Sequence, residues 1–169
     1  DEEYLFFWHP DLPDIDLKKN KKVVQDILNK TDILVGHNIK FDLSWIYSCG
    51  FKYEGKIYDT MIAEYVLYRG VKTKISLAEC CVRRGLIHKA TSIIDTYRSQ
   101  GMKFKDIIPK DIEFYGRRDV ECTRQLFHSQ VSDFNRKSNS SLVQTVRMMN
   151  KFTGVLTNME MNGIYIDKD

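Results

Sequence analysis

The sequence predicts an α/β fold, because short apolar runs alternate with patterns of helical periodicity. Residues 32–35 and 56–58 read as short strands, and each is followed by a helical pattern, which is typical of an α/β sandwich. Of the 169 residues, 43% are hydrophobic and 12% are aromatic. This composition is enough to bury one sizeable core, so it favours a single globular domain and argues against a disordered chain.

The first 50 residues predict two strands and two helices in alternation. Residues 4–8 form an aromatic and apolar run that a proline-containing turn closes, which reads as a strand. Residues 18–30 place aliphatic side chains at helical spacing among lysines, as in an amphipathic surface helix. After the strand at 32–35, we expect a helix over residues 39–49. It ends before Gly50, because glycine readily adopts the left-handed backbone that terminates a helix.

Capping residues mark the elements that follow. Asp59 comes directly after the strand at 56–58 and is expected to cap a helix. Ser76 and Glu79 match an S-x-x-E capping box, which predicts a short helix after Ser76. Residues 86–105 lack clear periodicity, so we predict an irregular, mobile excursion there.

Two long helices complete the predicted fold. Pro109 opens a helix over residues 110–134, since proline is well suited to the first helical position. A polar joint at residues 136–141 separates this helix from another over residues 142–161, which ends at Gly163.

Charge and cysteine content exclude several classes of protein. The net charge of +3 permits a polyanionic partner but does not by itself indicate nucleic-acid binding. The four cysteines form no CxxC pair and the four histidines are scattered, so we expect reduced thiols, with neither a disulfide framework nor a zinc site. With no apolar run of about 20 residues and no signal peptide, we expect a soluble cytoplasmic protein. Because the chain opens on Asp and runs directly into an apolar segment, we interpret it as an excerpt.

Two pairs of polar side chains are candidates for chemistry. Asp42 follows Asn38 by one helical turn just past a buried strand, where open α/β sheets place ligands. Asp119 follows Tyr115 by one turn on a face that is otherwise apolar, so its carboxylate needs a partner. Two aspartates from different helices suit Mg²⁺ or Mn²⁺. A favourable helix-dipole contact for Asp42 and a structural hydrogen bond for Tyr115 remain open alternatives.

Four sequence elements, in order along the chain, resemble one family of nucleases. VGHNIKFDLSWIYSCGF, followed by KIYDTMIAEYVL, resembles the second motif of DEDD exonucleases and the strand and helix after it. ISLAECCVRRGL resembles their S-L-A-E helix, and YGRRDVECTRQL resembles the third motif with its Y-x-x-x-D form. NMEMNGIYID resembles the element that leads from exonuclease to thumb in family A DNA polymerases. The chain is therefore similar to the 3′→5′ proofreading exonuclease of these polymerases.

The resemblance implies a ribonuclease H-like, DnaQ-like fold, with a mixed sheet flanked by helices and truncated at its N-terminus. Residues 1–135 would form the exonuclease domain without its first strands, and residues 136–169 would form a helical transition to the polymerase thumb. The implied reaction removes the 3′-terminal nucleotide of single-stranded DNA with two Mg²⁺ or Mn²⁺ ions. The implied partners are the DNA 3′ end and the polymerase domain of the same parent chain, in a monomer that does not contact a membrane.

The resemblance also assigns roles to individual residues. Asp42 and Asp119 would be metal ligands, and Tyr115 would orient the attacking water, so these three residues form the predicted catalytic group. The residues predicted to contact DNA are His37, Asn38 and Phe41. Family members often carry Gln and Tyr where His37 and Phe41 stand.

The first family motif, an Asp-x-Glu strand that supplies two more carboxylates, has no convincing counterpart here. Asp1 and Glu3 have this spacing, but the run after them resembles a later strand of the fold. We therefore expect the chain alone to be nearly inactive, with a sheet edge that the missing strands would otherwise cover.

Two other functional classes remain open. A stand-alone ribonuclease D-like exoribonuclease shares both residue pairs, and a noncatalytic exonuclease-like scaffold would keep the fold without the reaction. Pairs and groups of basic residues are interpreted first as solvated helix faces, with phosphate contact as the alternative; these are Lys18, Lys19, Lys21, Lys22, Arg83, Arg84, Arg117 and Arg118.

Overall fold

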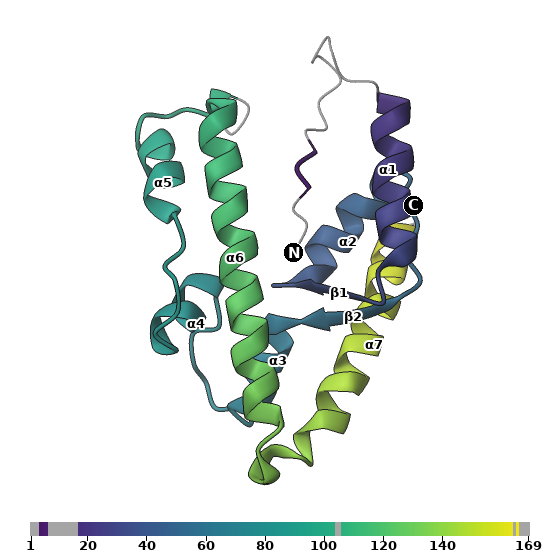
Figure 1. Cartoon of the computed structure of the whole chain (residues 1–169), viewed down its shortest axis with the longest axis vertical. Coiled ribbons are helices and arrows are strands. Elements are labelled where there is room, and N and C mark those ends of the chain that lie inside the picture. Colours follow the sequence, from purple (N-terminus) through teal and green to yellow (C-terminus); the bar gives the residue numbers. More distant parts are fainter. Residues whose placement is uncertain (1–3, 7–16, 104–105, 164, 166–169) are drawn as a thin grey trace.

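The computed structural model describes residues 4–6, 17–103, 106–163 and 165, and it is largely helical around a small parallel sheet (Figure 1). Strand β1 (Ile33–Gly36) pairs with strand β2 (Lys56–Asp59) in parallel. Helix α2 (Ile39–Ser48) lies in the segment that connects them, because two parallel strands need a long crossover connection. Both short strands predicted from the sequence are confirmed, each with its end shifted by one residue.

The sheet has two strands in the part of the chain that the structure describes, so the predicted mixed sheet is not seen there. Residues 4–6 are not in a strand, and the rest of the predicted strand at 4–8 lies outside the described residues. The edge of β1 away from β2 has no strand partner within the described ranges, and Ile33 on β1 is exposed. An uncovered sheet edge was expected from the resemblance.

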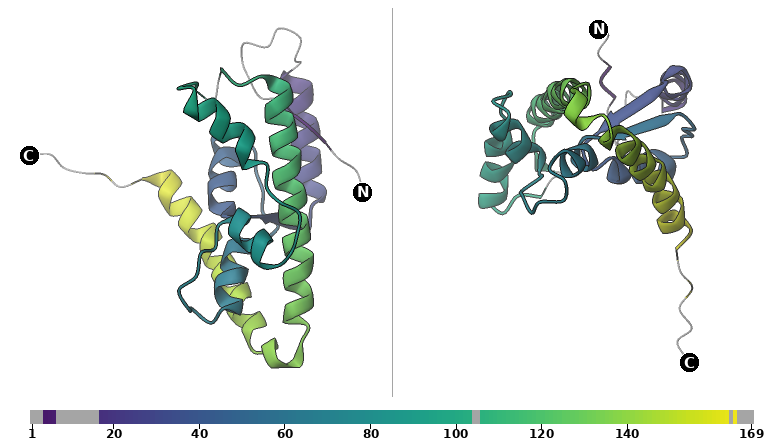
Figure 2. Two further views of the ribbon diagram at one scale, coloured as in Figure 1. Left: turned by 90° about the vertical axis from the view of Figure 1, so that its left-hand side faces the viewer. Right: turned by 90° about the horizontal axis from the view of Figure 1, so that it is seen from below.

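Helices pack on both sides of the sheet. Helices α1 (Leu17–Lys30) and α6 (Pro109–Phe134) lie on one side, where α6 packs against β1 (Figure 2). Helix α2 and helix α7 (Leu142–Asn162), which contact each other, lie on the other side, where α7 packs against β2 (Figure 2). Figure 1 shows α6 and α7 diverging from the short 3-10 turn η2 (Lys137–Asn139) that joins them. Figure 2 shows the same two helices inclined to each other when the molecule is turned.

Among the described residues, most buried apolar side chains fall into three clusters instead of the single core that the composition suggested. The first lies between α1, α2 and the strands around Leu43, and the second lies between α4 (Leu77–Arg83) and α6 around Leu126. The third joins α3 (Thr60–Leu67) to the C-terminal end of α6 and to α7 around Val146. The long α6 contributes to the second and the third cluster, so it links these two clusters.

Helix α5 (Thr91–Ser99) corrects the prediction that residues 86–105 are irregular. Its start carries no sequence signal, because its N-cap residue Ala90 cannot cap with its side chain. The helix is held by packing against α6: Ile94 is buried, and the Tyr97 hydroxyl donates a hydrogen bond to Asp111 over 2.5 Å. Tertiary contacts that are invisible in the local sequence thus stabilise α5.

The remaining structural expectations concern membranes and thiols. Within the described ranges, no helix is both long and apolar enough to cross a membrane. All four cysteines are free thiols, as predicted, and three of them are buried.

Candidate functional site

The candidate site lies at the carboxyl ends of the two parallel strands, where α2 and α3 begin. Strand β1 ends at Gly36 and β2 ends at Asp59, which are partners in the strand register. The Asp59 carboxylate is only 1% exposed and accepts hydrogen bonds from the backbone N–H groups of Asn38 (3.0 Å), Ile39 (3.1 Å) and Met61 (2.8 Å). One buried carboxylate therefore caps both helices; the sequence predicted only its cap on α3.

Asp42 lies in the first turn of α2 with its carboxylate close to the end of β1. A Cβ added at Gly36 would lie 3.3 Å from Asp42 Oδ2 and 2.9 Å from Ile39 Cγ1, so this close approach requires glycine. Partial burial of the carboxyl group, followed by the negative charge of Asp59, raises the pKa of Asp42 to about 6, although the residue as a whole is exposed. A cation next to Asp42 would relieve this repulsion and favour the ionised carboxylate.

His37, predicted to contact DNA, makes two hydrogen bonds within the chain. Its Nδ1 lies 2.9 Å from Thr60 Oγ1, and its Nε2 lies 3.0 Å from the carbonyl oxygen of Ile75. Burial lowers the pKa of His37, the charge of Asp59 opposes this effect and the charge of Lys89 adds to it. The ring therefore favours the neutral form with both nitrogens engaged, which leaves its carbon edges for any contact with DNA.

Asn38 and Phe41, also predicted to contact DNA, are both presented to solvent. Asn38 adopts a left-handed backbone (φ 61°, ψ 49°) at the N-cap of α2, and its side chain makes no capping hydrogen bond. Phe41 is 61% exposed, and its ring meets the 59% exposed Trp45 edge to face with centroids 6.3 Å apart. Trp45 was not among the predicted site residues, although its spacing of four residues from Phe41 places both on one helix face.

Tyr115 and Asp119 share a partner that the sequence did not suggest. Lys89, in the loop between α4 and α5, places Nζ 3.0 Å from Asp119 Oδ2 and 5.1 Å from the centroid of the Tyr115 ring. Burial would lower the pKa of Lys89, but hydrogen bonding to Tyr115 and Asp119 outweighs it and raises the pKa. The other oxygen of Asp119, Oδ1, is buried and has no hydrogen-bond partner.

The predicted joint metal site of Asp42 and Asp119 remains a prediction. The charge of Asp59 acts on Asp42, whereas Asp119 forms an ion pair with Lys89. The charges of Asp59 and Lys89 both act on His37, which therefore interacts electrostatically with both groups. Across the residues that the structure covers, no group of three or more His, Cys, Asp or Glu side chains is arranged to hold a metal ion. Two features nevertheless fit a cation: Oδ1 of Asp119 is buried without a hydrogen-bond partner, and burial and the charge of Asp59 raise the pKa of Asp42.

The interpretation of Arg83 and Arg84 as a solvated helix face is wrong. Both guanidinium groups form ion pairs with the fully buried Glu64 carboxylate. The N–O distance is 3.0 Å for Arg83 and 2.9 Å for Arg84. Arg84 also pairs with Asp133 over 2.6 Å. A buried carboxylate must be paired, so these arginines serve the ion network that joins α3, α4 and α6.

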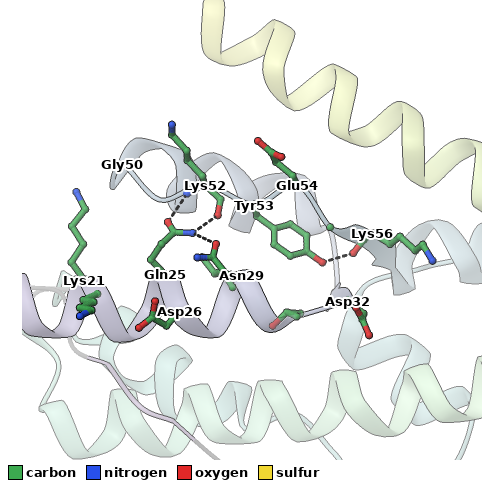
Figure 3. A pocket seen from close by; sticks show the side chains of 14 residues that line it. Lys21, Gln25, Asp26, Asn29, Asp32, Gly50, Lys52, Tyr53, Glu54 and Lys56 are labelled. Atoms are coloured by element: carbon green, nitrogen blue, oxygen red, sulfur yellow. Dashed lines mark hydrogen bonds between the residues drawn. The ribbon is translucent and has the colours of Figure 1, made fainter.

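A separate depression lies at the opposite, amino ends of the strands (Figure 3). It has a volume of about 1170 Å³ and lies between α1 and residues 50–56. Gln25 braces its two sides by hydrogen bonds to the backbone oxygen (2.8 Å) and nitrogen (2.9 Å) of Lys52. Its lining mixes lysines with Asp26, Asp32 and Glu54, so its charge favours no ligand class.

Comparison with known proteins identifies the family. Residues 12–132 match the family model of the 3′-5′ exonuclease domain of family A DNA polymerases, and the chain belongs to this family. The chain is also similar to DNA polymerase I of Borreliella burgdorferi, with 28% identity over 146 residues. That match covers 80% of this chain and 14% of the relative, so the chain spans only a small part of the relative's length. The resemblance seen in the motifs is thereby confirmed.

Proposed function

We propose that the chain is the 3′→5′ proofreading exonuclease part of a family A DNA polymerase. Its substrate would be the 3′ end of single-stranded DNA, and its fold would be the ribonuclease H-like fold. The observation that carries the proposal is Asp119, a largely buried carboxylate with an unpartnered oxygen one helical turn after Tyr115, in a member of this family. The similarity to DNA polymerase I favours DNA over the RNA substrate of a ribonuclease D-like enzyme.

In the proposed reaction, Asp42 and Asp119 hold Mg²⁺ or Mn²⁺. When bound, such ions would supply the positive charge that stabilises the attacking hydroxide and the departing 3′ oxygen. Tyr115 holds the attacking water in line with the phosphorus through its hydroxyl. Asn38 and Phe41 lie exposed at the N-terminal end of α2, where they contact the terminal nucleotides of the frayed strand.

A noncatalytic exonuclease-like scaffold is the second candidate. Two observations favour it: Lys89 already neutralises Asp119, and the described residues contain no three-ligand metal group. Asp1 and Glu3, the only Asp-x-Glu spacing near the start of the chain, lie outside the described residues.

Hydrolysis of 3′-labelled single-stranded DNA distinguishes the two candidates. We expect little or no Mg²⁺-dependent cleavage by the 169-residue chain, and clear activity when the Asp-x-Glu strands of a family member are joined to its N-terminus. In the extended protein, Asp42→Ala and Asp119→Ala should each lower turnover by orders of magnitude, because each deletes a ligand that stabilises charge in the transition state.

Two results would contradict parts of this proposal. If the extended protein stays inactive with every carboxylate in place, the scaffold candidate holds. If the short chain alone degrades DNA and Asp1→Ala or Glu3→Ala abolishes that activity, then the N-terminus itself supplies the first motif.

A further inference from the structure

Lys89 is the positive partner of Asp119, the carboxylate that the proposed reaction uses as a metal ligand. Its ammonium nitrogen lies 3.0 Å from Asp119 Oδ2, and only 19% of its side chain and 26% of that of Asp119 are exposed. At this burial the two opposite charges interact strongly, and the pair differs in this respect from the exposed ion pairs on the helix surfaces.

Three side chains of α6 hold the loop that carries Lys89. Arg118 Nε donates to the carbonyl oxygen of His88 over 3.0 Å, the backbone N–H of Ile87 donates to Gln125 Oε1 over 3.2 Å, and Cys122 Sγ lies 3.4 Å from the carbonyl oxygen of Ile87. The residues just before Lys89 are thus fixed along the same helix that presents Tyr115 and Asp119. This anchoring distinguishes Lys89 from a surface lysine that samples many positions.

We propose that Lys89 is a positioning residue that serves as the counter-ion of Asp119 in the metal-free chain, and that its ammonium group competes with a divalent cation for this carboxylate. The inference rests on the proposed function, which makes Asp119 a metal ligand. Lys89 is on Oδ2 and leaves Oδ1 unpartnered, but an ammonium ion and a divalent cation on the same carboxylate repel each other, so each weakens the binding of the other. Lys89 therefore keeps Asp119 paired without metal and weakens the binding of the first ion.

Mn²⁺ titration followed by electron paramagnetic resonance of the free ion tests this directly on the 169-residue chain. Lys89→Met keeps an unbranched stem and removes the charge, so Mn²⁺ affinity should rise by about tenfold or more. Lys89→Arg keeps the charge and should restore the original affinity. Lys74→Met is the matched control, because it removes the lysine of an exposed pair with Glu79 (3.5 Å) and should leave Mn²⁺ binding unchanged.

The outcomes separate this proposal from the proposed function. If Lys89→Met binds Mn²⁺ no more tightly than the unmodified chain, including the case in which neither binds, Lys89 does not compete with the ion and the proposal is overturned. Asp119→Asn, introduced together with Lys89→Met, should abolish the gain. If the gain persists without the Asp119 carboxylate, the ion is bound elsewhere, and the assignment of Asp119 as a ligand fails. Thermal unfolding of each variant verifies that it is folded.

Discussion

At the residue scale, the two predicted metal ligands have opposite electrostatic surroundings. Asp42 faces the negative charge of Asp59, whereas Asp119 faces the positive charge of Lys89. One carboxylate therefore costs stability in the metal-free chain and the other contributes to it. Such local conflict is common where function, and not folding, determines the residue.

Neutralising these two carboxylates should change stability in opposite directions. Asp42→Asn removes the repulsion with Asp59 and should raise the free energy of unfolding by about 1 kcal/mol at pH 8, a value that allows for the exposed part of the side chain. Asp119→Asn loses the ion pair with Lys89 and should lower it by about 1 kcal/mol or more. Urea unfolding of both variants measures the difference. If both substitutions change the free energy of unfolding equally, the charge of Asp59 does not destabilise the ionised Asp42.

Tyr115→Phe should separate positioning from metal binding in the extended, active protein. The substitution keeps the ring and its packing but deletes the hydroxyl, so turnover should fall less than in Asp119→Ala. Affinity for Mn²⁺ and for DNA should persist, because neither depends on that oxygen. Turnover and the two affinities are measured separately. A loss of DNA affinity equal to the loss of turnover would make Tyr115 a binding residue and not an orienting one.

At the scale of elements, helix α2 carries Asp42 together with two exposed aromatic rings. Phe41 and Trp45 are both more than half exposed, and Asp42 lies between them in the sequence. Two adjacent exposed rings suit successive bases of a single strand, since stacking tolerates any base. This arrangement extends the predicted contact of Phe41 by one ring.

Removal of either ring should weaken binding of a short oligothymidylate in Ca²⁺, which limits hydrolysis. Phe41→Ala and Trp45→Ala should each cost about 1–3 kcal/mol of binding free energy if the contact is base stacking. Phe152→Ala is the control, because Phe152 is 58% exposed on α7 and takes no part in the proposed site. Fluorescence anisotropy of the labelled DNA gives the affinities, and equal binding by all three variants would exclude the aromatic contact.

The elements that the sequence predicted are those with local signals. Asp59 and Ser76 cap α3 and α4 as expected, and Pro109 begins α6. Helix α5 was missed because its stability comes from Ile94 and from packing on α6, which no local pattern reveals. The same limit applies to Lys89, whose proximity to Asp119 depends on how the loop before α5 folds back onto α6.

At the scale of the whole molecule, a buried ion network connects elements that are distant in the sequence. Glu64 on α3 binds Arg83 and Arg84, at the C-terminal end of α4, and accepts a hydrogen bond from Gln130 on α6 over 2.9 Å. Sequence reasoning placed these arginines on a solvated face, because a charged pair gives no sign of its distant partner. The three separate apolar clusters make such a connection important, since it fixes α4 and α6 relative to α3.

Glu64→Gln should therefore destabilise the whole fold at neutral pH, by about 3 kcal/mol, because it removes the carboxylate partner of Arg83 and one of the two carboxylate partners of Arg84. Burial would raise the pKa of Glu64, but hydrogen bonds from Arg84, Gln130 and Arg83 outweigh it and hold the pKa below 4.5. The stabilisation is then fully present above about pH 4.5 and is lost as the pH falls through the lower, folded-state pKa. Urea unfolding across this range should show the difference between Glu64→Gln and the unmodified chain shrinking in acid. Glu113→Gln is the control, because it breaks the more exposed pair with Arg117 (2.9 Å) and should lower the free energy of unfolding by less than about 1 kcal/mol. If both variants lose the same free energy of unfolding, the buried network does not hold the fold together.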